Sequence, residues 1–326
     1  MSSKHSLLVV VLLLECLQAF GQTDSLYLRP DEFRYADNQR YTMFGGTPRR
    51  ETQVQPIPTI ALGAGFTGLA VALHIYQRNA WWPGGDSATF RFKEDLEYAR
   101  GLDKAGHVYS SYIVSTFTGD VLMESGFDRS SATWIGGATG LAYTLYVEIM
   151  DGYARDWGFS PSDAIADLVG SSFYVAQEYV PYLQNFTPRW NYTPAAWVGY
   201  PTSNQRQKTF IDDYNSTTFW LACNVNNMLP AKAAEYWPDW MMVSLGYGIR
   251  NYDVVDASGR EVGATRRFLI GLDYDWVKII PPSSVGVLNY LRQALNYIRL
   301  PGPTLEIGDE GVKLGVLYPF AIVVPI

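Results

Sequence analysis

The sequence contains few residues of the kinds that form disulfides or bind zinc, with only two cysteines and three histidines among 326 residues. Cys16 lies in a leader that we expect to be removed on export, which leaves Cys223 with no internal disulfide partner. The same cleavage removes His5 and leaves His74 and His107. The sequence therefore argues against a disulfide scaffold and against a zinc site rich in histidine.

The N-terminal segment has the three parts of a secretory signal peptide. Lys4 lies in a short polar start, Leu7–Leu14 is an unbroken apolar run, and Ala19–Gly21 supplies small residues before a cleavage site. The apolar run is shorter than the ~20 residues that span a bilayer. We predict residues 1–21 as a cleaved signal peptide. An uncleaved anchor and a lipid-modified Cys16 stay open as alternatives, although Cys16 follows an unsuitable glutamate.

Charge is also scarce, and its balance excludes one class of partner. The formal net charge is -7 and no basic stripe is present, so we expect no nucleic-acid partner. Charged residues make up 17% of the chain, whereas aromatic residues reach 15%, with 23 Tyr and 10 Trp. This composition suits a membrane–water boundary, where amphipathic rings settle. We therefore predict a membrane or lipid surface as partner; a soluble protein with a large aromatic core is the alternative.

The residue composition and hydrophobic pattern change along the chain, and this change predicts an α+β fold. We divide it into the leader, an extended lead-in at 22–55, a helical core at 56–186, and a region at 187–326 that is irregular and then rich in β-strands. About four apolar helices are expected in the core, because Ile57–Tyr76 and Ser130–Val147 carry no charged residue and Ala105–Gly119 and Pro161–Ala176 are apolar helical candidates. Ser160 is the expected N-cap of the last helix.

The C-terminal region is predicted as an antiparallel sheet interrupted by one helix, at about Val285–Ile298. Within Phe268–Val277 the later half alternates with period two, which is typical of a strand with one wet face. The candidate strands are Phe219–Val225, Met241–Ile249, Arg267–Ile280, Pro303–Ile307 and Val312–Phe320. Because a closed transmembrane barrel usually starts at ~8 strands, we expect a small sheet packed on the helical core.

One motif has a misleading appearance. Gly63-Ala64-Gly65-Phe66-Thr67-Gly68 matches the GxGxxG fingerprint of dinucleotide-binding oxidoreductases. That fold needs a preceding strand, but only a short apolar segment separates the motif from Pro56 and Pro58. We expect a packed, glycine-rich helix here, and keep a dinucleotide-binding oxidoreductase as the third functional hypothesis.

Acidic side chains and one histidine recur at helical spacing between residues 101 and 170. Asp103 and His107 are four apart, Glu148 and Asp151 are three apart, and Asp163 and Asp167 are four apart. Each pair therefore projects from one face of its helix. If the helices pack together, the three faces converge on one site.

Two functional interpretations and one structural interpretation fit this pattern. The candidate catalytic residues are Asp103, Lys104, His107, Glu148 and Asp151, with His107 as an acid/base steered by Asp103 or Glu148. Alternatively, Asp163 and Asp167 hold a divalent metal together with His107 and Glu148. In the structural interpretation, Asp103 is a helix N-cap, Asp163 is an early-turn acid, and the other groups form a satisfied buried network.

These residues also carry a resemblance to known proteins. Asp103-Lys104-x-x-His107, Glu148-x-x-Asp151-Gly152 and Trp157-Gly158-Phe159-Ser160 with Asp163 look like the YfiM-like family of predicted periplasmic lipoproteins, whose function is unknown. The order of the motifs also distantly resembles the VanZ-like membrane proteins. The match covers about residues 100–180. Asp167 is a departure, since many relatives are expected to carry Asn there.

Longer envelope proteins from Bacteroidetes-type bacteria look similar over most of the chain. In them we expect counterparts of Asp213-Tyr214-Asn215, Phe219-Trp220-Leu221, Gly246-Tyr247-Gly248 and Leu272-Asp273-Tyr274-Asp275. The resemblance implies export to a bacterial periplasm or outer membrane and supplies no activity.

The leading hypothesis is therefore an envelope protein that docks at a membrane through its helical core and is not demonstrably an enzyme. We predict no cofactor for it, although a divalent metal is possible. The competing hypothesis is a metal-assisted hydrolase or transferase that acts on a lipid or cell-wall component. It requires His107 to lie near Glu148 and Asp163.

Overall fold

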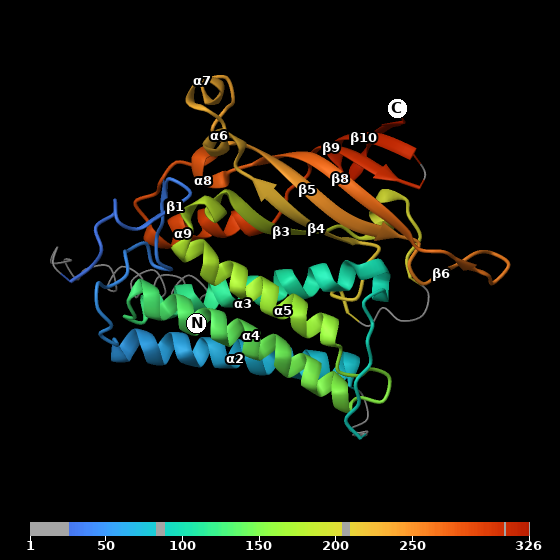
Figure 1. Ribbon diagram of the computed structural model, residues 1–326, viewed down its shortest axis with the longest axis horizontal. Coiled ribbons are helices and arrows are strands. Elements are labelled where there is room, and N and C mark those ends of the chain that lie inside the picture. The colour runs from blue at the N-terminus through green and yellow to red at the C-terminus, as the bar shows by residue number, and fades with distance from the viewer. Residues whose placement is uncertain (1–25, 83–88, 204–208, 310, 326) are drawn as a thin grey trace, which may run out of the picture.

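A layer of helices lies against one curved antiparallel sheet in the computed structural model (Figure 1). The structure describes residues 26–82, 89–203, 209–309 and 311–325; the predicted signal peptide lies outside them. The helical layer consists of α2 (Pro56–Trp81), α3 (Leu102–Glu124), α4 (Arg129–Tyr153) and α5 (Pro161–Tyr179). The predicted mixture of helices with an antiparallel sheet is confirmed.

Small residues let α3, α4 and α5 approach one another closely. A Cβ atom on Gly136 would lie 2.8 Å from the Ser115 carbonyl oxygen, and one on Gly140 would lie 2.7 Å from the Ser111 carbonyl oxygen. Backbone contact at this distance explains why small residues stand four apart in α4. Ser160 caps α5 as predicted, because its Oγ accepts a hydrogen bond from the Asp163 N–H at 3.3 Å.

Helix α2 differs from the other three: the helix expected over the GxGxxG segment is present, but the third functional hypothesis and the expected packing are wrong. It is one continuous helix, so the GxGxxG segment has neither the strand nor the tight turn of a dinucleotide site. The expected packing around its glycines is also wrong, because no atom of the described residues lies within 4 Å of a Cβ placed on Gly63, Gly65 or Gly68. Helix α2 has few close contacts with the other helices, so a bundle of four tightly packed helices is not confirmed.

The sheet has seven strands that neighbour one another in chain order, so it forms a simple meander. Its strands are β3 (Phe186–Tyr192), β4 (Thr217–Cys223), β5 (Met241–Arg250), β8 (Thr265–Tyr274), β9 (Gly302–Gly308), β10 (Gly311–Tyr318) and β11 (Phe320–Pro325). All five predicted strands are present, but the strand predicted at Arg267–Ile280 ends at Tyr274 and is followed by the short helix α8 (Trp276–Ile279). The edge strands β3 and β11 were not predicted, and β3 lies in a segment that we expected to be irregular.

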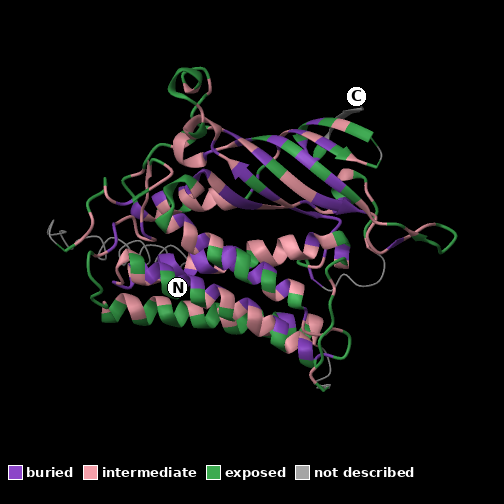
Figure 2. Ribbon diagram, viewed as in Figure 1, coloured by how far each residue is buried: buried purple, intermediate pink, exposed green. Residues whose placement is uncertain are grey.

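The faces of the sheet are reversed relative to those of an ordinary soluble protein. In β8, Phe268, Ile270 and Leu272 are exposed, whereas Arg267 and Asp273 on the opposite face are buried (Figure 2). An antiparallel sheet with one wet face normally buries its apolar side. The apolar row continues across neighbouring strands as Leu221, Leu245, Ile270, Leu305 and Leu314, which pair directly with one another. All of them are exposed except Leu305, which is half-buried.

Helix α3 contacts one end of this outer face. Gly106 would place a Cβ 3.4 Å from the Phe219 ring, and the Tyr109 and Phe219 rings are 5.7 Å apart. Leu102 and Ile249 are fully buried where α3 meets β5. The first turns of α3 are therefore fixed between the sheet and the other helices.

Short elements complete the chain. They are the hairpin β1 (Arg34–Tyr35) with β2 (Asn38–Gln39), the hairpin β6 (Val254–Val255) with β7 (Glu261–Val262), the short helices α6 (Val225–Met228), α7 (Ala231–Ala234), α8 (Trp276–Ile279) and α9 (Gly286–Ala294), and the 3-10 turns η1 (Tyr98–Gly101), η2 (Pro181–Asn185), η3 (Ala195–Val198) and η4 (Leu295–Tyr297). The predicted C-terminal helix corresponds to α9 followed by η4.

Candidate functional site

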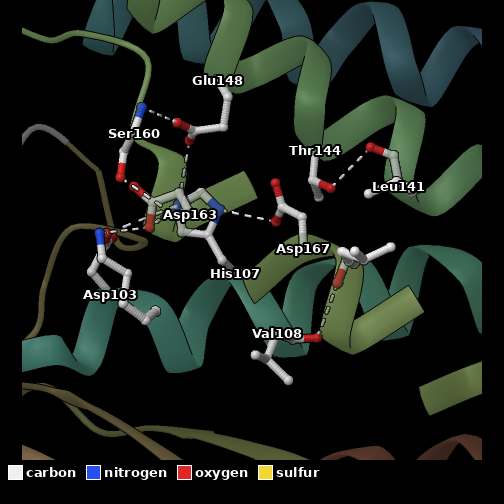
Figure 3. Close-up of polar contacts among 12 residues, drawn as sticks. Asp103, His107, Val108, Leu141, Thr144, Glu148, Ser160, Asp163 and Asp167 are labelled. Atoms are coloured by element: carbon white, nitrogen blue, oxygen red, sulfur yellow. Dashed lines mark hydrogen bonds and ion pairs between the residues drawn. The ribbon is translucent and has the colours of Figure 1, made fainter. Parts of the chain in front are cut away.

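Three helices bring the predicted polar residues together. His107 lies in the first turns of α3, Glu148 lies near the end of α4, and Asp163 and Asp167 lie in the first turns of α5 (Figure 3). The predicted convergence of these helix faces is therefore present. The N-cap of α5 also helps to place Glu148, because the Ser160 N–H donates to Glu148 Oε2 at 3.1 Å.

The His107 ring is the centre of the cluster, and its two nitrogens face different groups. Nδ1 lies 3.0 Å from Asp167 Oδ1. Nε2 lies 3.6 Å from Glu148 Oε1, 3.6 Å from Asp163 Oδ1 and 3.9 Å from Asp103 Oδ2 (Figure 3). The carboxylate that orients the ring is thus Asp167, rather than Asp103 or Glu148 as the sequence suggested.

Lys104 adds the second basic group of the cluster. Its Nζ lies 2.5 Å from Asp95 Oδ1, 2.6 Å from Asp163 Oδ1 and 2.9 Å from Asp103 Oδ2. Asp163 and Asp103 therefore face Lys104 and His107 with the same oxygen atoms. Lys104 holds these two carboxylates in place and offsets part of their charge.

Asp103 is positioned differently from the expected N-cap. The N-cap of α3 is Gly101, whose φ of 80° is in the left-handed region that favours glycine, and Asp103 lies within the first turn. Its Oδ1 accepts a hydrogen bond from the Tyr214 hydroxyl at 2.6 Å. Sequence reasoning missed this role, although the Asp213-Tyr214-Asn215 triplet was noted as a shared motif. Asp95 was missed entirely, because no local pattern distinguishes it from the charged residues around it.

Asp151 is the one predicted residue that stands apart from the His107 contacts. Its Oδ1 accepts a hydrogen bond from Trp82 Nε1 at 2.6 Å, at the end of α2. Asp151 still lines the same cavity as His107 and Glu148. Its spacing correctly predicted a shared helix face but not a direct contact with the histidine.

Burial and mutual charge shift the pKa values of the cluster strongly. Burial alone would lower the pKa of His107, but the hydrogen bond to Asp167 and the charges of Asp103 and Asp163 outweigh it and raise this pKa to about 10. Burial raises the pKa of Glu148 to about 8 and that of Asp163 to about 7. The pKa of Asp103 is lowered, because His107 and Lys104 outweigh its burial.

The cluster carries more acid than base. Asp95, Asp103, Glu148, Asp163 and Asp167 surround one ammonium and one imidazole. Among the described residues, Asp167 Oδ2 has no hydrogen-bond partner although it is buried. A cluster of this kind attracts a cation or retains protons, since like charges at short distance raise one another's pKa.

Three side chains of the cluster lie close enough together to bind one metal ion. One donor atom each from Asp103, His107 and Asp163 lies within 4.8 Å of the other two. Donor atoms around a tetrahedral ion with bonds of ~2.0–2.1 Å lie ~3.3 Å apart. The His107 contacts of 3.6 and 3.9 Å are a few tenths of an ångström wider. Asp167 lies on the Nδ1 side of the ring, so it orients His107 and is not placed to share an ion with Nε2.

A cavity of about 320 Å³ opens onto the cluster. His107, Glu148 and Asp163 form part of its lining, together with apolar side chains from α2, α3, α4 and the loop before β4. The acidic cluster is therefore accessible from a largely apolar space. This combination of a few polar groups and apolar walls is typical of small-molecule sites.

A family model matches part of the chain. No curated protein and no solved structure matches the chain. Residues 92–178, which contain most of the polar cluster, match a family described as predicted periplasmic lipoprotein (DUF2279). This segment is therefore similar to an exported family of unknown function, and the expected export to the periplasm is confirmed.

Proposed function

We propose that this protein is a membrane-associated envelope protein whose polar cluster binds a divalent cation and performs hydrolysis or group transfer on a lipid or cell-wall component. The proposal rests on one observation: carboxylate oxygens of Glu148, Asp163 and Asp103 lie 3.6–3.9 Å from His107 Nε2. The distance condition for the metal-assisted hypothesis is met. The narrower resemblance to YfiM-like and VanZ-like proteins stays a prediction.

The donor set supports a hard or borderline ion such as Mn²⁺ or Zn²⁺. Asp103 and Asp163 offer carboxylate oxygens, and His107 offers an imidazole nitrogen. Metal-ligating histidines usually donate their other N–H to a carboxylate, which fixes the tautomer and the ring orientation. Asp167 Oδ1 stands in that position, 3.0 Å from Nδ1.

Glu148 is the group best placed for proton transfer beside the ion. It is 2% exposed, its Oε2 accepts from the Ser160 N–H, and its Oε1 faces the centre of the cluster. Burial raises the pKa of Glu148 in the ion-free cluster, whereas a divalent cation beside it would lower this pKa and leave a carboxylate that can accept a proton. A divalent ion at this point would polarise a substrate oxygen or lower the pKa of a bound water.

Two surfaces support membrane association. In the described part of the chain, α2 is the one helix long and apolar enough to cross a membrane, and its apolar window is not buried. The exposed apolar row of the sheet is the second surface, with Leu245 at 52% and Ile270 at 45% exposure. Apolar residues facing outwards and charged residues facing inwards are typical of sheets in lipid.

The membrane part of the proposal is tested by fractionation. The mature protein should stay with membranes through high-salt and alkaline washes and should be released by detergent. Complete recovery in a salt-washed soluble fraction without detergent would overturn it.

The catalytic part is tested by turnover of chromogenic acyl esters and phosphodiesters with detergent-solubilised protein. We expect hydrolysis that stops with chelator, returns with Mn²⁺ or Zn²⁺, and falls at least ~100-fold in Glu148→Gln. Glu124→Gln is the matched control, because Glu124 is an acid of α3 that instead accepts from the Phe44 N–H at 3.1 Å. Turnover that is equal in the wild type and in Glu148→Gln, or insensitive to chelator, would contradict the proposal.

A further inference from the structure

The cavity next to the cluster has a polar end and an apolar end. At the polar end are His107 on α3 and Glu148 on α4, and Trp81 and Trp82 of α2 donate to Asp212 and Asp151 nearby. Away from the cluster the wall includes the apolar side chains Leu73 on α2 and Ile113 and Val114 on α3, with the polar side chains Gln77, Ser110, Tyr143 and Thr144 between them. The change in chemistry follows the direction of the helices.

The length of the apolar part follows from helix geometry. Val114 lies seven positions after His107 in α3, and at 1.5 Å per residue this corresponds to ~10 Å along the helix. On α2, Leu73 lies eight positions before Trp81, which corresponds to ~12 Å. The apolar space therefore extends from the cluster by about the length of eight methylene groups, at ~1.3 Å each along an extended chain, in the space between helices.

Helix α2 forms one wall of this space and also faces outwards. Leu73 and Gln77 line the cavity, whereas Leu69 and Ile75 on the same helix are exposed. The cavity is thus separated by a single, sparsely contacted helix from the surface that we assign to lipid. An apolar chain could pass between the two with little change in environment.

We propose that this cavity binds the hydrocarbon chain of an amphiphile and places its polar group at the His107 cluster. The inference rests on the proposed function, because it names the substrate class of that same site: a molecule with a hydrolysable or transferable polar group and an acyl or alkyl chain. The apolar walls select the chain, and the surplus of carboxylates at the other end selects a polar group that can reach a cation.

The test uses 8-(dansylamino)octan-1-ol, an uncharged probe whose alkyl chain matches the apolar part, and the mature chain in a bile-salt detergent, which has no linear alkyl chain to compete. Trp157 and Trp190 line the cavity, so binding is read as energy transfer from tryptophan to the dansyl group. Affinity for unlabelled n-alkyl competitors should rise about fourfold per methylene, from ~0.8 kcal/mol each, and level off near eight carbons.

Variants that fill the cavity, at its apolar end in Val114→Phe and beside Glu148 in Val147→Phe, give the structural control. Val147→Phe and Val114→Phe should each weaken probe binding at least tenfold, whereas Ile149→Phe, on the exposed face of the same helix as Val147, should leave it unchanged. Unaltered melting temperatures show that the variants fold. Wild-type affinity in both filling variants, or affinity that does not depend on chain length, would overturn the inference.

Two further measurements distinguish failure of this inference from failure of the proposed function and identify the kind of lipid that supplies the hydrocarbon chain. Probe binding is repeated with chelator and in Glu148→Gln, where chain binding should persist within about threefold although turnover is lost. Binding without any cation-dependent turnover would overturn the proposed function alone. Turnover of water-soluble short esters without probe binding would overturn the inference alone. Competition by lysophospholipid against diacyl phospholipid of equal chain length distinguishes a one-chain from a two-chain ligand.

Discussion

His107 Nδ1 lies 3.0 Å from Asp167 Oδ1, and this contact determines what the second ring nitrogen can do. With the Nδ1 proton directed at Asp167, Nε2 faces Glu148, Asp163 and Asp103. A lone pair opposite three carboxylates is electrostatically unfavourable, so a proton or a metal ion must lie between them. The two states compete, and metal binding therefore releases protons.

Changes at Asp167 should alter cation affinity without removing a proposed ligand. Asp167→Ala deletes the acceptor of the Nδ1 proton, and we expect a loss of ~10–100-fold in affinity for Mn²⁺ or Zn²⁺. Asp167→Asn keeps an Oδ1 acceptor and should lose less, which fits the expectation of Asn at this position in related sequences. Calorimetric titration of both variants checks the order. Wild-type affinity in Asp167→Ala would contradict the orienting role.

Two glycine substitutions should change stability in opposite directions. Gly140→Ala places a Cβ 2.7 Å from the Ser111 carbonyl oxygen and should lower the free energy of unfolding by ~1–3 kcal/mol. Gly65→Ala meets no atom within 4 Å in the part of the chain that the structure describes, and it should raise this free energy by up to ~1 kcal/mol through better helix propensity. Thermal unfolding in detergent measures both. Equal stability of the two variants would show that α4 is not packed as described.

The buried carboxyl of Asp151 gives a prediction for pH dependence. Burial raises its pKa from 3.8 to about 7, so between about pH 4 and pH 7 the folded state keeps a proton that the unfolded state has released. The free energy of unfolding therefore falls as pH rises through this window and stays lower above it. Asp151→Asn should reduce the loss between pH 5 and pH 8 by on the order of 2–3 kcal/mol. Asp31→Asn, an exposed acid, is the control; equal pH profiles for wild type and Asp151→Asn would refute the assignment.

Much of the site could be predicted from local spacing, because side chains three or four apart on a helix share a face. The pairs on α3 and α5 and the position of Glu148 on α4 all lead to His107. The parts that could not be predicted depend on residues distant in sequence: Asp95 reaches Lys104 from before η1, and Tyr214 reaches Asp103 across 111 positions. The spacing of residues along one helix or strand carries no information about such contacts.

In the sheet, too, local sequence patterns predicted some strands, whereas other features depend on how the strands pack. Strands with alternating side chains were predicted, but β3 contains Pro188 and was not. Proline is tolerated there because β3 is an edge strand. The alternation in β8 also indicated one wet face, and it could not show that the buried side is the charged one. On that buried side Arg189 of β3 pairs with Asp273 of β8 at 2.9 Å, a contact between residues 84 positions apart.

The reversed sheet predicts how an outward substitution affects membrane retention. Ile270→Asp places a charge in the middle of the exposed apolar row, so a larger fraction of the protein should be released by high salt than in the wild type. Arg260→Asp, in the exposed hairpin of β6 and β7, should leave retention unchanged. Fractionation of both variants checks this. Equal retention of wild type and Ile270→Asp would place this row in water.

The most direct test of the account is titration of chelator-treated protein with Mn²⁺ and Zn²⁺, comparing wild type with His107→Ala. The control is His74→Ala, since His74 lies on α2 and contacts the Tyr146 hydroxyl at 2.9 Å instead of the cluster. We predict one binding site per chain with proton release, an affinity at least ~100-fold weaker in His107→Ala, and no change in His74→Ala. Absence of binding in the wild type, or equal affinity in His107→Ala, would contradict the proposed cation site.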